Sequence, residues 1–356
     1  MSPGLRSRLL PMAEALFIEG GALLVSMVLF GFFLMFFAGQ DPFAVYGNMW
    51  QGSFGQAFSR TDSLSKAAPL MLTALCTALP ARLGMVIIGN EGALLLGALG
   101  AVATGVFLGQ GMPLVTIPLM MLVGSVIGGA WIALAGGLRQ YRGVNETISS
   151  LLLFYIGLAV FKFLVEDVMR DPASLNKPST MPIGEANMIG QIPGLGVHWG
   201  LIVGIVMCIA MYVLMHWTTF GFSARVVGGN ERAARLQGLP INRIVIITCM
   251  LAGAAAGIAG CIEMAIAEGK ANASLNAGLG FAGILVAFVA RQNPLAIIPV
   301  AILFGGITAS GGLIQRRHNL PDATVQVFTG ILFIVVLASE MLFGKISWFK
   351  PKEAAK

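Results

Sequence analysis

The chain has 356 residues, of which 57% are hydrophobic and 11% are charged, and its formal net charge at pH 7 is +6. A soluble domain carries roughly 25% charged residues, and a soluble fold of this length has no way to bury so much apolar surface. The composition therefore excludes a soluble protein and predicts an all-α polytopic membrane protein, whose 46 glycines suit closely packed helices. The basic balance does not indicate nucleic-acid binding, because the lysines and arginines stand at the edges of apolar runs.

The apolar runs predict the membrane spans. A helix that crosses the membrane needs about 20 mostly apolar residues. Ten segments reach or approach this length, in chain order 20–38, 67–84, 86–108, 113–134, 147–165, 199–217, 244–266, 278–290, 295–314 and 323–343. Asn90 and Glu91 interrupt the third segment. The eighth is short and rich in glycine, which predicts a partial or re-entrant helix.

These spans predict a single transmembrane domain over residues 20–343. Residues 1–19 are expected to form a cytoplasmic N-terminal segment, and residues 344–356 a cytoplasmic tail. Arg6 and Arg8 precede the first apolar run, and no small-residue cleavage pattern follows it. We therefore expect a retained helix and not a signal peptide.

Lysine and arginine set the orientation of a membrane protein when they gather in short loops on one side. Ten crossings put both termini on one side, and placing that side in the cytoplasm accounts for most of the 22 lysines and arginines. The residues so placed are Arg6, Arg8, Arg82, Arg139, Arg142, Arg225, Arg232, Arg235, Arg243, Arg291, Lys345, Lys350, Lys352 and Lys356. Arg316 and Arg317 contradict the rule, because the same topology leaves them outside.

Two segments outside the membrane are long. Residues 39–65 are polar and aromatic, which predicts a segment lying flat at the membrane interface. Residues 166–198 carry four prolines and mixed charge, and form either a solvated connector or a docking surface for an extracytoplasmic partner. On the opposite side, residues 220–243 form a basic loop of helix-compatible residues, which predicts an ordered helix that docks against another protein.

An internal repeat joins the two halves of the chain. Gly89-Asn-Glu-Gly92 and the apolar residues after it resemble Gly280-Phe-Ala-Gly283 and its continuation. Each is followed by a Pro-Leu pair, at Pro113 and Pro294, and each of these prolines has a glycine eleven residues later, Gly124 and Gly305. Paired, glycine-interrupted segments indicate the central pathway of a transporter.

A few polar residues stand where apolar ones are expected. Ionisable groups inside spans usually face a cavity or a partner, and Glu91, between two glycines, is the clearest case. Glu263 is predicted to line an outer vestibule. Asn145 is read first as an N-cap and Glu146 as a first-turn acid, and Gln292-Asn293 as a simple turn before Pro294.

No catalytic or metal-binding set is evident. The four cysteines, Cys76, Cys208, Cys249 and Cys261, fall inside apolar spans and read as small core residues. The three histidines are scattered, and no Gly-x-x-x-x-Gly-Lys-Ser/Thr phosphate loop is present. The chain is therefore not expected to be an enzyme. ATP and magnesium, if used, would bind another subunit, which leaves a permease subunit or a secondary carrier.

Four motifs resemble one known family, the membrane-spanning permease subunits of bacterial ABC importers for nucleosides and simple sugars, in the branched-chain amino acid and sugar permease group. They are Gly89-Asn-Glu-Gly92, Gly143-Val-Asn-Glu-Thr-Ile-Ser-Ser150 with Tyr155, Val227-Gly-Gly-Asn-Glu-Arg-Ala-Ala-Arg235 through Gly238, and Gly280-Phe-Ala-Gly-Ile-Leu-Val-Ala287 with Asn293-Pro294-Leu295. The Val-Asn-Glu run at Asn145 looks particularly like the nucleoside branch.

The resemblance implies a multi-pass protein of the bacterial inner (plasma) membrane that works with partners. These are an ATP-binding subunit, a second permease subunit in a homodimer or heterodimer, an extracytoplasmic solute-binding protein and membrane lipid. It also implies that a coupling element sits in a groove of the ATPase, made of Gly229, Asn230, Glu231, Arg232, Ala233, Ala234, Arg235 and Gly238. The expected substrate pathway comprises Asn90, Glu91, Gly92, Phe281, Gly283 and Glu263.

The sequence departs from the family pattern near this pathway. Ile87 stands where an asparagine is usual, Ala93 where glutamine is frequent, and Ala282 where an acid is frequent. A nucleoside is the expected cargo, with a ribose-like sugar as the alternative. Two other classes remain open: an ion-coupled carrier with a proton or sodium site at Glu91, and a membrane scaffold without transport.

Overall fold

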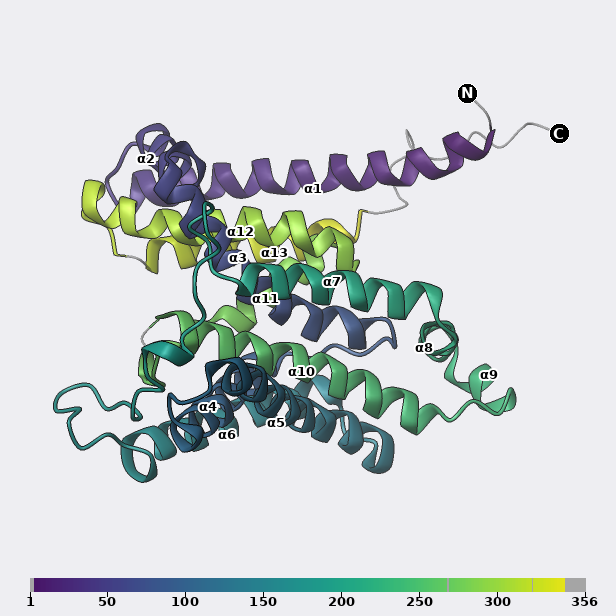
Figure 1. Cartoon of the computed structure of the whole chain (residues 1–356). Helices are drawn as coiled ribbons and strands as arrows, with labels where there is room; N and C mark the ends of the chain where they lie inside the picture. The colour runs from purple at the N-terminus through teal and green to yellow at the C-terminus, as the bar shows by residue number, and fades with distance from the viewer. Residues whose placement is uncertain (1–2, 268, 322, 343–356) are drawn as a thin grey trace. The chain divides into compact units, whose positions relative to one another are not determined.

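The computed structural model describes residues 3–267, 269–321 and 323–342, which form helices joined by turns and loops, with isolated β-bridges and no strand (Figure 1). In chain order the helices are α1 Pro3–Phe36, α2 Pro42–Trp50, α3 Ala57–Ala81, α4 Asn90–Leu108, α5 Pro113–Arg142, α6 Glu146–Phe163, α7 Gly200–Trp217, α8 Thr219–Gly229, α9 Glu231–Leu236, α10 Ile241–Ala267, α11 Leu279–Val289, α12 Pro294–His318 and α13 Ala323–Glu340. Single π-helical turns follow α2 and α6. The predicted tail, 344–356, lies outside the described residues.

Each predicted span corresponds to one helix. Among the described residues, eight helices are long and apolar enough to cross a membrane: α1, α3, α4, α5, α6 with its π turn, α7, α10 and α12. The other two predicted spans are the shorter helices α11 and α13. Helix α11 has 11 residues, or roughly 16 Å at 1.5 Å per residue, which confirms the predicted partial helix.

Three helices begin at other residues than the apolar runs predict. Helix α1 runs unbroken from Pro3, so it continues the first predicted span back through residues 3–19. Helix α3 begins at Ala57, ten residues before the apolar run, because its first turns contain an Asp62–Lys66 ion pair one helical turn apart, with Ser63 buried on the packed face. Helix α4 begins at Asn90, whereas the preceding residues 85–88 lie outside any helix.

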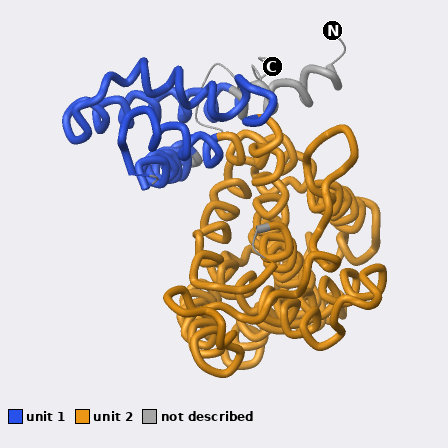
Figure 2. The backbone as a smooth tube through the Cα atoms, turned by 60° about the vertical axis from the view of Figure 1, so that its left-hand side comes forward, with its two compact units in different colours: residues 1–59, 307–356 blue, residues 60–306 orange. Residues whose placement is uncertain are grey.

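Two compact units divide the chain, and Figure 2 colours them separately. The first unit comprises residues 1–59 and 307–356. Within it, the ring of the fully buried Phe30 packs on that of Phe328 at 4.9 Å, which joins α1 to α13. The Arg317 guanidinium donates to Asn48 Oδ1 at 2.5 Å and to Gln51 Oε1 at 2.9 Å. Asn48 and Gln51, at the end of α2, therefore provide hydrogen-bond acceptors for the Arg317 guanidinium.

In the second unit, residues 60–306, α10 packs against α4, α5 and α8. Helices α4 and α5 cross α10 at glycines, where backbone meets backbone: a Cβ on Gly97 would meet Gly257 Cα, and one on Gly124 would lie 3.1 Å from Gly257 O. Small residues at such crossings let membrane helices approach closely. The glycines of the sequence therefore set the packing of this unit.

The two ends of α10 carry different structures. The α8–α9 segment, residues 218–238, precedes the start of α10, and Figure 1 shows it away from the long loop after α6. That loop is bonded to the far end of α10: Ile183 N donates to Gly269 O at 2.8 Å and Ile189 N to Ala265 O at 3.2 Å. Backbone hydrogen bonds therefore attach residues 166–198 to this end of α10.

Candidate functional site

A polar junction lies where α4 begins. Asn90 and Glu91 are fully buried, although both stand in an otherwise apolar region. The Glu91 carboxylate accepts hydrogen bonds from two backbone amides at the start of α11, Gly278 N at 2.9 Å and Gly280 N. Glu91 thereby caps a helix whose N-cap residue, Gly278, lies 187 residues later in the chain, and it satisfies amides that would otherwise be orphaned in an apolar medium.

Both glycine motifs of the repeat meet at this junction. Gly278 has a φ of +77°, a conformation that glycine adopts without strain. A Cβ on Gly280 would collide with the Glu91 backbone, and one on Gly283 with Thr73 of α3. The glycines expected to line a pathway therefore allow α3, α4 and α11 to approach closely.

Two threonines of α3 complete the junction. Asn90 Nδ2 donates to Thr77 Oγ1 at 2.7 Å and to Thr73 O at 3.2 Å. Thr73 Oγ1 in turn donates to Leu279 O at 3.2 Å. Neither threonine was predicted as a site residue, although their spacing of four residues within an apolar span places them on one helix face.

Of the remaining predicted pathway residues, Gly92 is buried and Phe281 is 40% exposed. The Phe281 ring meets that of Phe154 edge-on at 5.2 Å. Glu263, on α10, lies within electrostatic range of Glu91 and of the α3 pair Lys66 and Asp62. The structure thus brings α4, α6, α10 and α11 together around the predicted residues.

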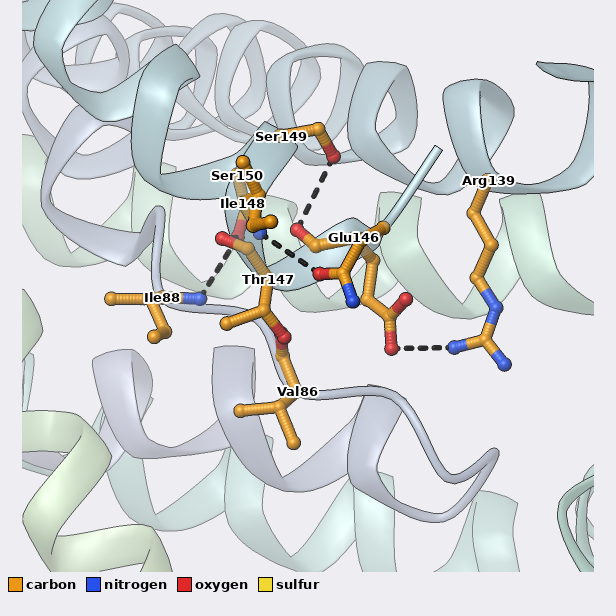
Figure 3. Close-up of polar contacts among 9 residues, drawn as sticks. Val86, Ile88, Arg139, Glu146, Thr147, Ile148, Ser149 and Ser150 are labelled. Atoms are coloured by element: carbon orange, nitrogen blue, oxygen red, sulfur yellow. Dashed lines mark hydrogen bonds and ion pairs between the residues drawn. The ribbon is translucent and has the colours of Figure 1, made fainter. Parts of the chain in front are cut away.

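The start of α6, where the Val-Asn-Glu motif stands, holds the non-helical segment that leads into α4. Asn145 Oδ1 accepts from Ile148 N at 3.1 Å, and Glu146 pairs with Arg139 at 2.6 Å. The first reading of Asn145 as an N-cap and Glu146 as a first-turn acid is therefore confirmed. Figure 3 shows the links to the segment before α4: Thr147 Oγ1 donates to Val86 O at 2.9 Å, and Ile88 N donates to Ser150 Oγ at 3.1 Å.

Replacing Asn145 by alanine should destabilise the start of α6. Loss of an asparagine N-cap costs about 1 kcal/mol, so we expect the purified protein in detergent to unfold at a lower temperature. Asn145→Ser, which retains a capping oxygen, should restore most of the difference. Equal unfolding temperatures for Asn145→Ala and the unaltered protein would contradict the capping role.

The α8–α9 segment is helical, as the sequence predicts, but it is split in two. Asn230 separates the helices, because its backbone is extended and its side chain accepts from Ala233 N at 3.0 Å. Glu231 and Arg235 pair with each other at 3.0 Å on the exposed face. Ala234 is buried within the chain, whereas Leu236 is 86% exposed.

This segment also lines a cavity of about 180 Å³. Gly228, Gly229 and Asn230 form one wall, and Met85 and Arg139 belong to the other walls. The predicted cytoplasmic residues Arg82, Arg139 and Arg225 lie at this end of the second unit, since Arg139 lines the cavity, Arg225 belongs to α8 and the Arg82 carbonyl oxygen lies next to Gly228. Gly238, with φ +75°, ends the segment. Of the coupling residues expected from the family, Arg232 projects from α9 as an exposed cation.

Apolar helices that break around a polar junction define a multi-pass membrane transport protein. The chain belongs to the family described as branched-chain amino acid transport system / permease component, whose sequence profile matches residues 59–337. The family expected from the motifs is therefore confirmed, and the protein is a multi-pass permease of the plasma membrane.

Three relatives cover most of the chain. A glucose ABC transporter permease of Haloferax volcanii is 30% identical over 84% of this chain and 81% of its own length. A guanosine ABC transporter permease of Bacillus subtilis is 26% identical over 91% and 94%. A nucleoside ABC transporter permease of Lactococcus lactis is 27% identical over 92% and 94%.

Proposed function

We propose that the chain is the permease subunit of an ATP-driven ABC importer and forms half of a translocation pathway for a nucleoside. The observation that carries this is the resemblance to guanosine and nucleoside permeases over more than nine-tenths of the chain. The polar junction around Glu91 supports a pathway for a neutral polar solute. Asn90, Glu91, Gly92, Phe281, Gly283 and Glu263 are the proposed pathway residues.

In this proposal the chain binds no nucleotide itself. ATP and magnesium bind separate ATPase subunits, which draw the α8–α9 segments of two permease subunits together. The second permease subunit completes the pathway, and a solute-binding protein delivers cargo to the ordered loop after α6. Both termini then lie in the cytoplasm, which places the arginines of the α8–α9 end on the cytoplasmic side.

A simple sugar is the second candidate cargo, because the glucose permease of Haloferax volcanii has 30% identity to this chain. Uptake of labelled adenosine, uridine, ribose and glucose, measured in cells with and without the chain, separates the two. We expect selective loss of nucleoside uptake. Loss of sugar uptake alone would assign a sugar as the cargo. Uptake that persists without any ATPase but is abolished by an uncoupler would indicate an ion-coupled carrier.

Reversing the charge of Arg232 should uncouple transport from ATP hydrolysis. Arg232 is exposed on α9, so Arg232→Glu should leave the fold intact and lower uptake at least tenfold, a factor that corresponds to about 1.4 kcal/mol. Membrane levels and uptake are measured together. Arg142→Glu, which alters an exposed arginine at the end of α5, is the matched control, and normal transport by Arg232→Glu would refute the coupling role.

A further inference from the structure

The connection between α3 and α4 is bordered by two side chains that hold both ends of α11. Arg82, directly after α3, donates from Nη2 to Gln292 O at 3.1 Å, just beyond the end of α11. Glu91, in the first turn of α4, accepts from the amides at the start of α11. One short stretch of chain, residues 82–91, therefore spans the whole length of this short helix.

Arg82 occupies an unusual position for an arginine at the edge of a span. Its guanidinium is half-buried, and its buried Nε has no acceptor among the residues that the structure describes. Burial, and then the nearby positive charge of Arg225, lower the pKa of Arg82. Arg82 is therefore held by the protein through its bond to Gln292 and is not fully hydrated at the membrane surface.

The α8–α9 segment rests directly on Arg82. A Cβ on Gly228 would overlap the Arg82 carbonyl oxygen and would lie 3.0 Å from Leu83 Cα. Only glycine allows α8 to sit this close to the 82–91 stretch. Because the contact is backbone against backbone, a displacement of α8 moves Arg82 and is not absorbed by flexible side chains.

The far end of α11 is a strained turn. Arg291 and Gln292 have φ values of +48° and +57°, which residues with a Cβ adopt only when their surroundings hold them there. The hydrogen bond from Arg82 to Gln292 O is one such restraint, together with the bond from Gln292 N to Ala287 O at 2.8 Å. A change at Arg82 therefore removes one of the restraints on a strained turn.

We propose that Arg82 is a positioning residue that transmits movement of the α8–α9 segment, through the Gly228 contact, to α11 and the junction at Glu91. This inference rests on the proposed function, because the force comes from the ATPase subunits. Arg82 touches no solute in this scheme. Arg82 instead sets the position of α11, the helix that contacts the solute. This also explains why Arg82 and Glu91 stand at the two ends of the same stretch of chain.

The test uses the complete transporter, with its ATPase subunits, second permease and solute-binding protein, in proteoliposomes. The readout is solute transported per ATP hydrolysed. Gly228→Ala and Arg82→Gln should each lower this ratio at least tenfold while ATP hydrolysis continues, and Arg82→Lys, which retains a charged donor, should recover part of it. Gly137→Ala, at a helical glycine with open space around its Cβ position, and Arg142→Gln are the controls.

Two further measurements separate positioning from mere folding. The double variant Gly228→Ala/Arg82→Gln should lower the ratio no further than either single change, since both interrupt one route. Spin labels at Leu236→Cys and Asn276→Cys, both exposed positions, should change their separation on ATP binding in the unaltered protein and not in Gly228→Ala. Unchanged ratios, or a label separation that still responds in Gly228→Ala, would overturn the proposal.

Failure of the proposed function gives a different pattern. In that case the unaltered chain would not retain ATPase subunits on purification, or would take up none of the solutes, whatever the variants do. The label separation requires no knowledge of the solute. If ATP binding changes the label separation in the unaltered complex and not in Gly228→Ala, transmission of movement through the Gly228 contact is supported, even where the cargo is a sugar.

Discussion

Gly257→Ala is expected to lower the stability of the protein by about 3 kcal/mol, at the upper end of the usual cost of overpacking. Gly257 lies where α10 crosses α4 and α5, and an added Cβ would collide with the Gly124 carbonyl oxygen and approach Gly128 Cα to 3.3 Å. These obstacles are backbone atoms, so the methyl group fits only if the helices move apart. Thermal unfolding in detergent and the amount of protein in the membrane measure the effect.

Gly137→Ala provides the matched control for this prediction. Gly137 also lies in a helix of this unit, but nothing occupies the space around its Cβ position. Replacing an unconstrained helical glycine by alanine stabilises by roughly 0.5–1 kcal/mol. The two substitutions are chemically identical and should shift the unfolding temperature in opposite directions. A Gly257→Ala protein that unfolds at the same temperature as Gly137→Ala would show that the helix crossing is not tight.

The helices of this fold follow from local sequence. Apolar length predicted every span, and the glycine-rich composition of 278–290 predicted that α11 would be short. Capping was also local: Asn145 accepts from an amide three residues later, and Glu146 pairs with an arginine seven residues earlier. Such features depend on neighbours a few residues away, so the order of residues alone identifies them.

The start of α4 depends on distant residues and was therefore predicted wrongly. Residues 86–89 are apolar enough for a helix. However, the Ser150 hydroxyl accepts a hydrogen bond from the Ile88 amide, and the Thr147 hydroxyl donates one to the Val86 carbonyl oxygen. Both partners lie about 60 residues further along the chain. The hydrophobic pattern near residues 86–89 contains no information on these two partners. Their long-range hydrogen bonds override the local preference for helix only once the helices are assembled.

The candidate site shows the same division. Glycines and a lone glutamate in a span identified Glu91, Gly280 and Gly283 as special positions. What each contacts was not accessible, since Glu91 and its partner Gly278 are separated by 187 residues. From the sequence, Arg82 was interpreted only as a charge that sets orientation, because no residue near it in the chain indicates a hydrogen bond to Gln292. The positions of lysines and arginines indicate which side of the membrane a loop is on, but they do not indicate which groups each side chain contacts.

Glu91→Leu should abolish most transport and also destabilise the protein. Leucine fills a similar volume but accepts no hydrogen bond, so the half-buried Gly278 amide and the buried Gly280 amide lose their acceptor. Each orphaned buried amide costs about 1–3 kcal/mol. We expect uptake to fall at least tenfold and the unfolding temperature in detergent to fall with it, because the start of α11 is no longer fixed.

Comparison of solutes separates this structural role from direct recognition of cargo. Glu91→Gln keeps one carbonyl acceptor, so if Glu91 only holds α11, this variant should lower uptake of adenosine, uridine and guanosine by the same factor. Gly280→Ala, whose Cβ would collide with the Glu91 backbone, should produce the same uniform loss while leaving the carboxylate in place. Unequal losses for Glu91→Gln together with normal stability would assign the carboxylate to solute binding. The structure favours the uniform loss, since both carboxylate oxygens already accept hydrogen bonds from the chain itself.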